Sequence, residues 1–140
     1  MIELIDPIIS SNKVDISTGL NVHYLEASKN NNNQPIALLL HGFPELSFSW
    51  RKIIPILAYE GFRVIAPDMR GYGLTSGGTK KYDTNISEYR LLNLTTDILS
   101  LISALKINKV DLLVGHDAGS SVAGTSALIR PDIFKSVVMM

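Results

Sequence analysis

The stretch V-G-H-D-A-G at residues 114–119 decides the fold, because it joins an apolar run to a small-residue helix through a very tight turn. It has the G-x-S-x-G form of a nucleophile elbow, with Asp117 where that pattern has serine. Glycines on both flanks let a strand and a helix approach closely, and the central residue of so tight a turn is strained. The amino end of the helix then faces Asp117 with free N–H groups and a positive dipole, which keeps the carboxylate ionised and ready to attack.

Asp117 also fits a simpler interpretation, since aspartate is a favoured N-cap and stands here directly before a predicted helix. A short pattern with a glycine at each end also occurs by chance. The elbow, however, requires a strand before it and a helix after it, and the sequence predicts both. This context favours the interpretation of Asp117 as a nucleophile.

Apolar strands and amphipathic helices alternate outward from the elbow. Short runs that are apolar throughout predict strands covered on both faces, at residues 36–40, 62–66, 110–114 and 136–140. Apolar residues at helical spacing predict helices at residues 49–60, 87–105 and 118–129. This alternation predicts an α/β fold with right-handed crossovers, a mostly parallel sheet and helices on both of its faces.

Two further segments complete the predicted architecture. Residues 13–17 and 21–26 carry strand-like residues around a turn at residues 18–19, so they predict a leading antiparallel hairpin. Residues 68–83 are rich in Gly, Ser and Lys and predict a loop. Within this loop we expect Asp68 and Arg70 to tie the chain through charge-assisted hydrogen bonds, which is a structural role rather than a chemical one.

The carboxyl ends of parallel strands meet at one edge of a sheet, and ligands of such sheets bind there. Three of these ends follow Leu40, Ala66 and Val114. The sequence H-G-F-P comes directly after the first end, at residues 41–44. Taken alone, it is interpreted as a Gly-Pro turn with a packing phenylalanine.

Three motifs stand in order at these successive strand ends. They are H-G-F-P-E at residues 41–45 with Trp50 beyond it, D-M-R-G-Y-G from Asp68, and V-G-H-D-A-G at residues 114–119. Together they resemble the α/β-hydrolase family of epoxide hydrolases and haloalkane or haloacid dehalogenases, over about residues 14–140. The fold that the resemblance implies is the amino-terminal part of an α/β-hydrolase core.

The resemblance also implies roles for particular residues. The backbone N–H groups of Phe43 and Ala118 would form an oxyanion hole beside Asp117. Pro44 has no N–H group and cannot donate there. Pro44 and Trp50 are expected to contact the substrate.

The aspartate at position 117 narrows the reaction within this family. It implies attack on a saturated carbon and an alkyl ester on the enzyme, which water activated by a histidine then cleaves. One oxyanion-hole donor is typically worth about 3 kcal/mol in such a step. Haloalkane dehalogenases usually have Trp after the aspartate, to hold the halide, and fluoroacetate-type enzymes usually have Arg. Here the residue is Ala118, which favours an epoxide hydrolase that forms a diol.

Two alternatives remain open: a haloalkane or haloacid dehalogenase, and a non-catalytic binding protein on the same fold. In the family, the general base histidine, its acidic partner and a helical cap follow the nucleophile. His23, His41 and His116 are interpreted as structural. We therefore expect residues 1–140 to be one partial core domain that does not turn over alone, with residues 136–140 as an exposed edge that favours aggregation.

Composition bounds the partners and the compartment. The chain has 13 basic and 13 acidic residues, so its zero net charge gives no electrostatic case for nucleic acid or anionic membrane. It has no cysteine, no signal-like start and no apolar run of spanning length, so a cytoplasmic location is expected. A small-molecule substrate is expected, with no metal and no cofactor, and the oligomeric state is left open.

Overall fold

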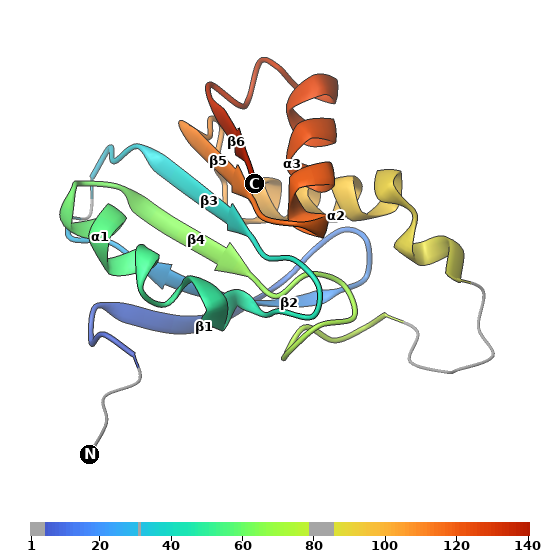
Figure 1. Cartoon of the computed structure of the whole chain (residues 1–140), viewed down its shortest axis with the longest axis horizontal. Coiled ribbons are helices and arrows are strands. Elements are labelled where there is room, and N and C mark those ends of the chain that lie inside the picture. Colours follow the sequence, from blue (N-terminus) through green and yellow to red (C-terminus); the bar gives the residue numbers. More distant parts are fainter. Residues whose placement is uncertain (1–4, 31, 79–85) are drawn as a thin grey trace.

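The computed structural model describes residues 5–30, 32–78 and 86–140. Their strands form one sheet in the order β1-β2-β4-β3-β5-β6 (Figure 1). The strands β4, β3, β5 and β6 run parallel, and β1 and β2 form an antiparallel hairpin that joins β4. Their bounds are β1 Ile9–Asp15, β2 Asn21–Ala27, β3 Ile36–Leu40, β4 Arg63–Pro67, β5 Leu112–Gly115 and β6 Val137–Met139. The α/β class, the parallel strands and the leading hairpin are thus confirmed.

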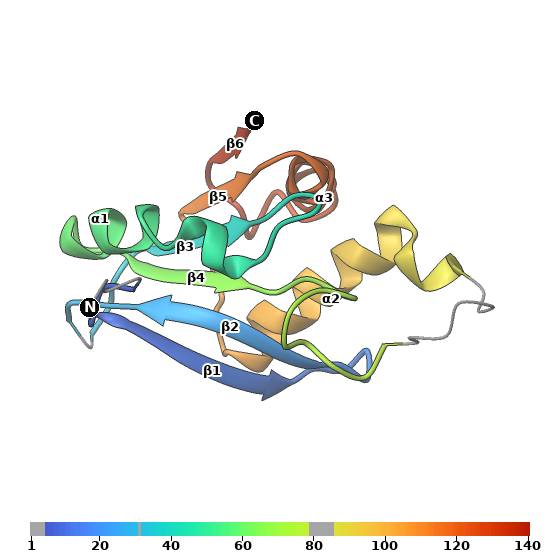
Figure 2. The same cartoon turned by 60° about the horizontal axis from the view of Figure 1, so that its bottom comes forward.

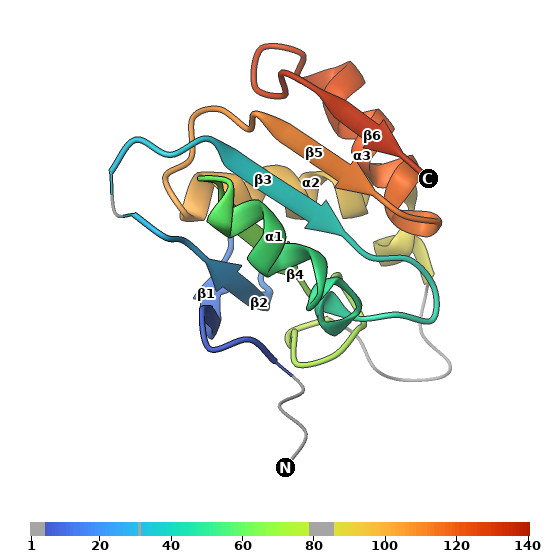
Figure 3. The ribbon, with the colours of Figure 1, turned by 60° about the vertical axis from the view of Figure 1, so that its left-hand side comes forward.

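Helices cover both faces of the sheet, as predicted. Helix α1 (Ile53–Tyr59) lies on one face, and α2 (Leu91–Ala104) and α3 (Ala118–Ile129) lie on the other (Figures 2 and 3). Two short 3₁₀ segments, η1 (Ser47–Trp50) and η2 (Ile86–Tyr89), precede α1 and α2. Each α-helix lies between two of the parallel strands in the chain.

Alternate residues of each central strand build the two cores. In β3, Leu38 and Leu40 pack in the cluster under α2 and α3, whereas Ala37 and Leu39 pack in the cluster under α1. All four side chains are fully buried. Fully burying one leucine is worth about 1.5–3 kcal/mol. An apolar residue at every position of β3 is therefore what a strand between two helical layers requires.

The helix predicted at residues 49–60 is shorter in the structure. It is divided into η1 and α1, and α1 begins only at Ile53. Pro55 explains the difference, because in a continuous helix from Ser49 its ring would clash with the carbonyl of Arg51. In the first turn of α1, Pro55 is tolerated because its missing N–H would have no helical partner.

The other boundaries shift by a few residues. The helix predicted at residues 87–105 is divided in the same way, because Arg90 is extended (φ −62°, ψ 147°) and α2 begins after it. The strand predicted at residues 110–114 is shorter in the structure, because β5 begins at Leu112 and Val110 makes only an isolated bridge to Phe134. The loop predicted at residues 68–83 is observed as far as Gly78, and its remainder lies outside the described residues.

Candidate active site

Asp117 occupies the tight turn between β5 and α3 with φ 54° and ψ −120°. A residue other than glycine in such a conformation costs about 1–3 kcal/mol and persists only where its surroundings hold it. The backbone holds it here, since Asp117 N–H donates to the carbonyl of Met140 at 2.8 Å, and Gly119 N–H donates to the carbonyl of His116 at 2.9 Å. The Asp117 side chain makes no capping hydrogen bond to α3. The geometry therefore fits a strained elbow better than an ordinary N-cap.

Three glycines make the close packing around the elbow possible. A Cβ atom at Gly115 would lie 2.3 Å from the carbonyl oxygen of Gly119, and one at Gly119 would lie 2.4 Å from that of Leu40. A Cβ atom at Gly42 would lie 2.5 Å from the Cβ atom of Asp117. These separations are far below van der Waals contact, so β3, the loop after it and α3 converge only because these side chains are absent.

The loop after β3 holds one oxygen of the Asp117 carboxylate. The N–H of Phe43 donates to Oδ1 at 3.0 Å. The N–H groups of Phe43 and Ala118, together with the charge of His116, hold the pKa of Asp117 below its usual value. Within the described residues, Oδ2 accepts no hydrogen bond. An exposed carboxylate thus has one oxygen fixed and one free to react.

His41 fixes the loop that carries Phe43, and its ring is buried. Because a carbonyl only accepts, His41 Nδ1–H must donate to Gly42 O at 2.9 Å, and Nε2 then accepts from Met69 N–H at 3.0 Å. Burial lowers the pKa of His41, which agrees with a neutral ring. His41 therefore joins the loops that follow β3 and β4, which is the structural role that the sequence indicated.

The two residues expected to contact substrate differ in their exposure to solvent. Pro44 is exposed beside Phe43, and the peptide bond between them is cis. Trp50 is only 8% exposed and belongs to the apolar cluster under α1. Its Nε1–H is buried without a partner among the described residues. A direct contact of Trp50 with a substrate stays a prediction, and its packing role is what the structure shows.

Two residues near the carboxylate were not predicted from the sequence to belong to the site. His116, which the sequence indicates as structural, has Nδ1 3.3 Å from Oε2 of Glu45. Tyr72 packs edge-on against His41, with ring centroids 4.8 Å apart. Burial and the charge of Asp117 raise the pKa of the Tyr72 phenol. The only sequence signal for either residue was its place inside a strand-end motif.

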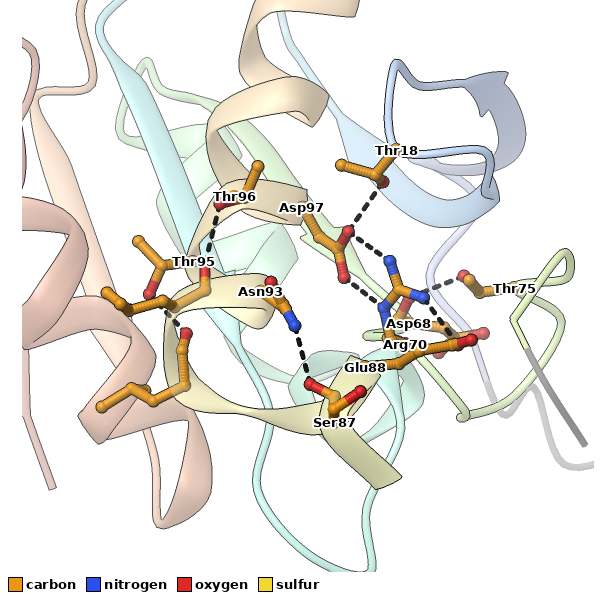
Figure 4. A network of polar contacts seen from close by, with 12 residues as sticks. Thr18, Asp68, Arg70, Thr75, Ser87, Glu88, Asn93, Thr95, Thr96 and Asp97 are labelled. Atoms are coloured by element: carbon orange, nitrogen blue, oxygen red, sulfur yellow. Dashed lines mark hydrogen bonds and ion pairs between the residues drawn. The ribbon is translucent and has the colours of Figure 1, made fainter. Parts of the chain in front are cut away.

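The loop after β4 is tied down as expected (Figure 4). Arg70 donates through Nε and Nη2 to both carboxylate oxygens of Asp97, at 2.7 and 2.8 Å. Glu88 lies 3.2 Å from Nη1, and the Thr18 hydroxyl donates to Asp97 at 2.7 Å. A bidentate Arg–carboxylate pair is among the stronger protein hydrogen bonds. It links this loop to α2 and to the turn of the hairpin.

The described part of the chain offers neither a metal site nor a membrane-spanning helix. Residues 5–30, 32–78 and 86–140 contain no cluster of three His, Asp or Glu side chains arranged to hold a metal ion. None of the helices described there has both the length and the apolar character needed to cross a membrane.

Comparisons with known proteins show which sequences and folds this chain resembles. The sequence profile of the alpha/beta hydrolase fold matches residues 35–140. An epoxide hydrolase of Caballeronia sordidicola is 43% identical over 88% of this chain and 35% of its own length. Epoxide hydrolase B of Mycobacterium tuberculosis is 39% identical over 86% of this chain and 32% of its own length.

Solved structures show the same likeness and the same difference in length. The structure of potato (Solanum tuberosum) epoxide hydrolase I is 38% identical, with a TM-score of 0.83, and the match covers 94% of this chain and 39% of that one. An epoxide hydrolase from an endophytic Streptomyces is 36% identical, with a TM-score of 0.83, over 96% of this chain and 37% of that one. The chain thus spans between about a third and two fifths of the length of these relatives.

Proposed function

The chain belongs to the epoxide hydrolase family of the α/β-hydrolase fold, and from this premise we propose that Asp117 is the nucleophile that opens an epoxide. The single observation that carries the proposal is the asymmetric setting of its carboxylate. Oδ1 is held by the N–H of Phe43, while Oδ2 is left open at the carboxyl edge of the sheet. A nucleophile fixed at one oxygen attacks with the other in a defined direction.

The first step forms an ester. Oδ2 of Asp117 bonds to a ring carbon of the epoxide, the C–O bond of the ring breaks, and the released oxygen takes up a proton from water. The product is a β-hydroxyalkyl ester of Asp117, with Oδ1 as its carbonyl oxygen. The low pKa of Asp117 supports this step, because the carboxylate is ionised at neutral pH.

The second step returns the carboxylate. Water adds to the ester carbon and loses a proton, and negative charge develops on Oδ1, where the N–H groups of Phe43 and Ala118 would stabilise it. The bond from this carbon to the alkyl oxygen then breaks, and that oxygen takes up a proton and leaves as part of the diol. Each such donor is typically worth about 3 kcal/mol. None of the three histidines is placed to activate that water, because His23 and His41 hold buried hydrogen bonds and His116 pairs with Glu45. We therefore assign to this chain the nucleophile and the oxyanion hole, and no complete turnover.

Intact-protein mass spectrometry tests the proposal directly. The 140-residue chain is incubated with styrene oxide, and peptide mapping locates any adduct. We expect one added epoxide mass on Asp117 that is absent from Asp117→Asn. The matched control is Asp132→Asn, because Asp132 is an exposed aspartate paired with Arg130 beyond the far end of α3. That variant should retain the adduct.

The alternatives correspond to other results. Equal labelling of exposed carboxylates, or no labelling of Asp117, would contradict the nucleophile and favour a binding protein on this fold. A chloroalkane is tested in parallel, because a dehalogenase would form the corresponding alkyl ester with release of chloride. Faster esterification by the chloroalkane than by the epoxide would favour that alternative.

A further inference from the structure

A hydrogen-bonded line of three residues lies away from Asp117, on the hairpin side of the sheet. Ser11 Oγ lies 2.7 Å from His23 Nε2, and His23 Nδ1 lies 2.7 Å from Asp68 Oδ2. Ser11 is on β1, His23 is on β2, and Asp68 follows β4. In the sheet, β4 and β3 separate β2 from β5, so this line is distinct from the elbow.

The line has a defined direction for proton transfer. A carboxylate only accepts, so Asp68 fixes the proton of a neutral His23 on Nδ1. Nε2 is then an acceptor, and the Ser11 hydroxyl is the donor in the 2.7 Å bond. A serine that donates to a histidine held by a buried aspartate is the arrangement of an activated serine nucleophile.

Asp68 is held firmly in place. Oδ1 accepts from Ser47 N–H at 2.9 Å, and Oδ2 accepts from Leu74 N–H at 3.0 Å. Burial raises the pKa of Asp68, but the hydrogen bonds from Leu74, Ser47 and His23 outweigh burial and leave it below the usual value. His23 N–H also donates to the Thr75 hydroxyl. That hydroxyl donates to the carbonyl of Asp68 at 2.6 Å (Figure 4).

The serine opens onto a cavity rather than into the core. His23 and Asp68 are 6% and 3% exposed, whereas Ser11 is exposed. A depression of about 480 Å³ is lined by all three residues. A purely structural hydroxyl would satisfy His23 without such a space beside it. The rest of the lining is mostly apolar and includes Leu25, Leu46, Phe48 and Leu74.

We propose that Ser11, His23 and Asp68 form a second nucleophilic site that transfers acyl groups from small apolar esters. Ser11 Oγ bonds to the acyl carbon as its proton passes to His23 Nε2. The bond from the acyl carbon to the alcohol oxygen breaks, and that oxygen takes the proton from His23. Water then repeats the sequence and releases the carboxylic acid and free Ser11. The apolar lining would hold the acyl chain, and the site is independent of the function proposed for Asp117.

A fluorophosphonate with a short alkyl chain tests the site, because it phosphonylates activated serines and releases fluoride. After treatment of the 140-residue chain, peptide mapping should place the adduct on Ser11. The neighbouring Ser10 is the internal control, since its hydroxyl donates to the carbonyl of Glu26 and accepts from the Asn12 side-chain amide, rather than bonding to a histidine. Ser11→Ala should lose the adduct and the hydrolysis of p-nitrophenyl butyrate, at least tenfold, and Ser10→Ala should lose neither.

His23→Gln tests the base, and circular dichroism establishes whether that buried variant is folded. A folded His23→Gln should label Ser11 at least tenfold more slowly. Labelling of Ser10 and Ser11 at equal rates, or no labelling of Ser11, would overturn the proposal even if His23→Gln does not fold. The epoxide adduct at Asp117 should be unchanged in Ser11→Ala, so failure of either proposal is visible separately.

Discussion

The backbone N–H of Phe43 lies 3.0 Å from Oδ1 of Asp117, although 74 positions separate the two residues in the chain. This contact joins the loop after β3 to the elbow after β5. It fixes one carboxylate oxygen in a conformation that the backbone around Asp117 already constrains. The same donor that would stabilise an oxyanion thus orients the carboxylate beforehand.

The first prediction concerns the pH dependence of ester formation. The pKa of Asp117 is lowered, so its carboxylate stays ionised down to below the ordinary aspartate value of 3.8. The rate of epoxide adduct formation should therefore be flat through neutral pH, and should fall only as acid protonates the carboxylate below that value. The carboxyl carbon shift of Asp117 in an NMR titration measures the pKa directly. A midpoint above 3.8 would contradict the donation by Phe43 and Ala118.

The second prediction uses the space between Gly42 and the elbow. In Gly42→Ala the new methyl would lie 2.5 Å from the Asp117 Cβ atom and 2.8 Å from the carbonyl oxygen of His116. Because both neighbours belong to a rigid turn, the loop must move and Phe43 N–H must leave Oδ1. We expect a loss of about 1–3 kcal/mol in stability, as for other overpacked sites, and at least a tenfold slower epoxide adduct.

Gly78→Ala is the matched control for this prediction. In this variant the atoms nearest to the new methyl would lie 3.7 Å from it, which is an ordinary van der Waals contact. Unfolding in urea and adduct formation, measured on both variants, separate a general effect of added methyl groups from a specific one. Equal behaviour of the two variants would show that the close approach at Gly42 is not needed.

Elements with a strong local pattern were predictable from the sequence. Strand β3 and helix α3 have the predicted bounds, because a wholly apolar run and a glycine-flanked turn determine them locally. Helix α1 was predicted too long, because the apolar spacing outweighed the restriction that Pro55 imposes. The elbow was predictable for the same reason as β3, since its glycines are required by contacts within a few residues.

Contacts made by side chains across the fold could not be predicted in this way. The His116–Glu45 pair depends on the direction of two side chains from separate loops. The Ser11–His23–Asp68 line joins three elements, and no spacing in the sequence marks it. For Trp50, the family motif predicts a substrate contact, which stays a prediction, and the structure adds that the ring packs in the apolar cluster under α1.

The third prediction concerns the buried bidentate ion pair between Arg70 and Asp97. Asp97→Asn removes the charge that Arg70 binds through two nitrogens, and leaves a guanidinium that is mostly buried. Removing one partner of a buried pair typically costs about 3–5 kcal/mol. The exposed pair between Arg130 and Asp132 has the same bidentate geometry, so Asp132→Asn should cost far less stability than Asp97→Asn. Urea unfolding measures the stability of both variants. Similar losses of unfolding free energy would show that burial of the Arg70–Asp97 pair adds nothing to its contribution.

The fourth prediction concerns β6, which is the last strand on one side of the described sheet. Val138 and Met139 are 42% and 62% exposed there. An exposed apolar edge strand offers unpaired backbone groups to another chain, and a charge placed on it discourages such pairing. Val138→Lys should therefore lower self-association of the 140-residue chain, measured by light scattering as a function of concentration. Leu128→Lys, at an 82% exposed position on α3, adds the same charge away from the edge. An equal effect of the two lysines would assign the change to net charge and not to β6.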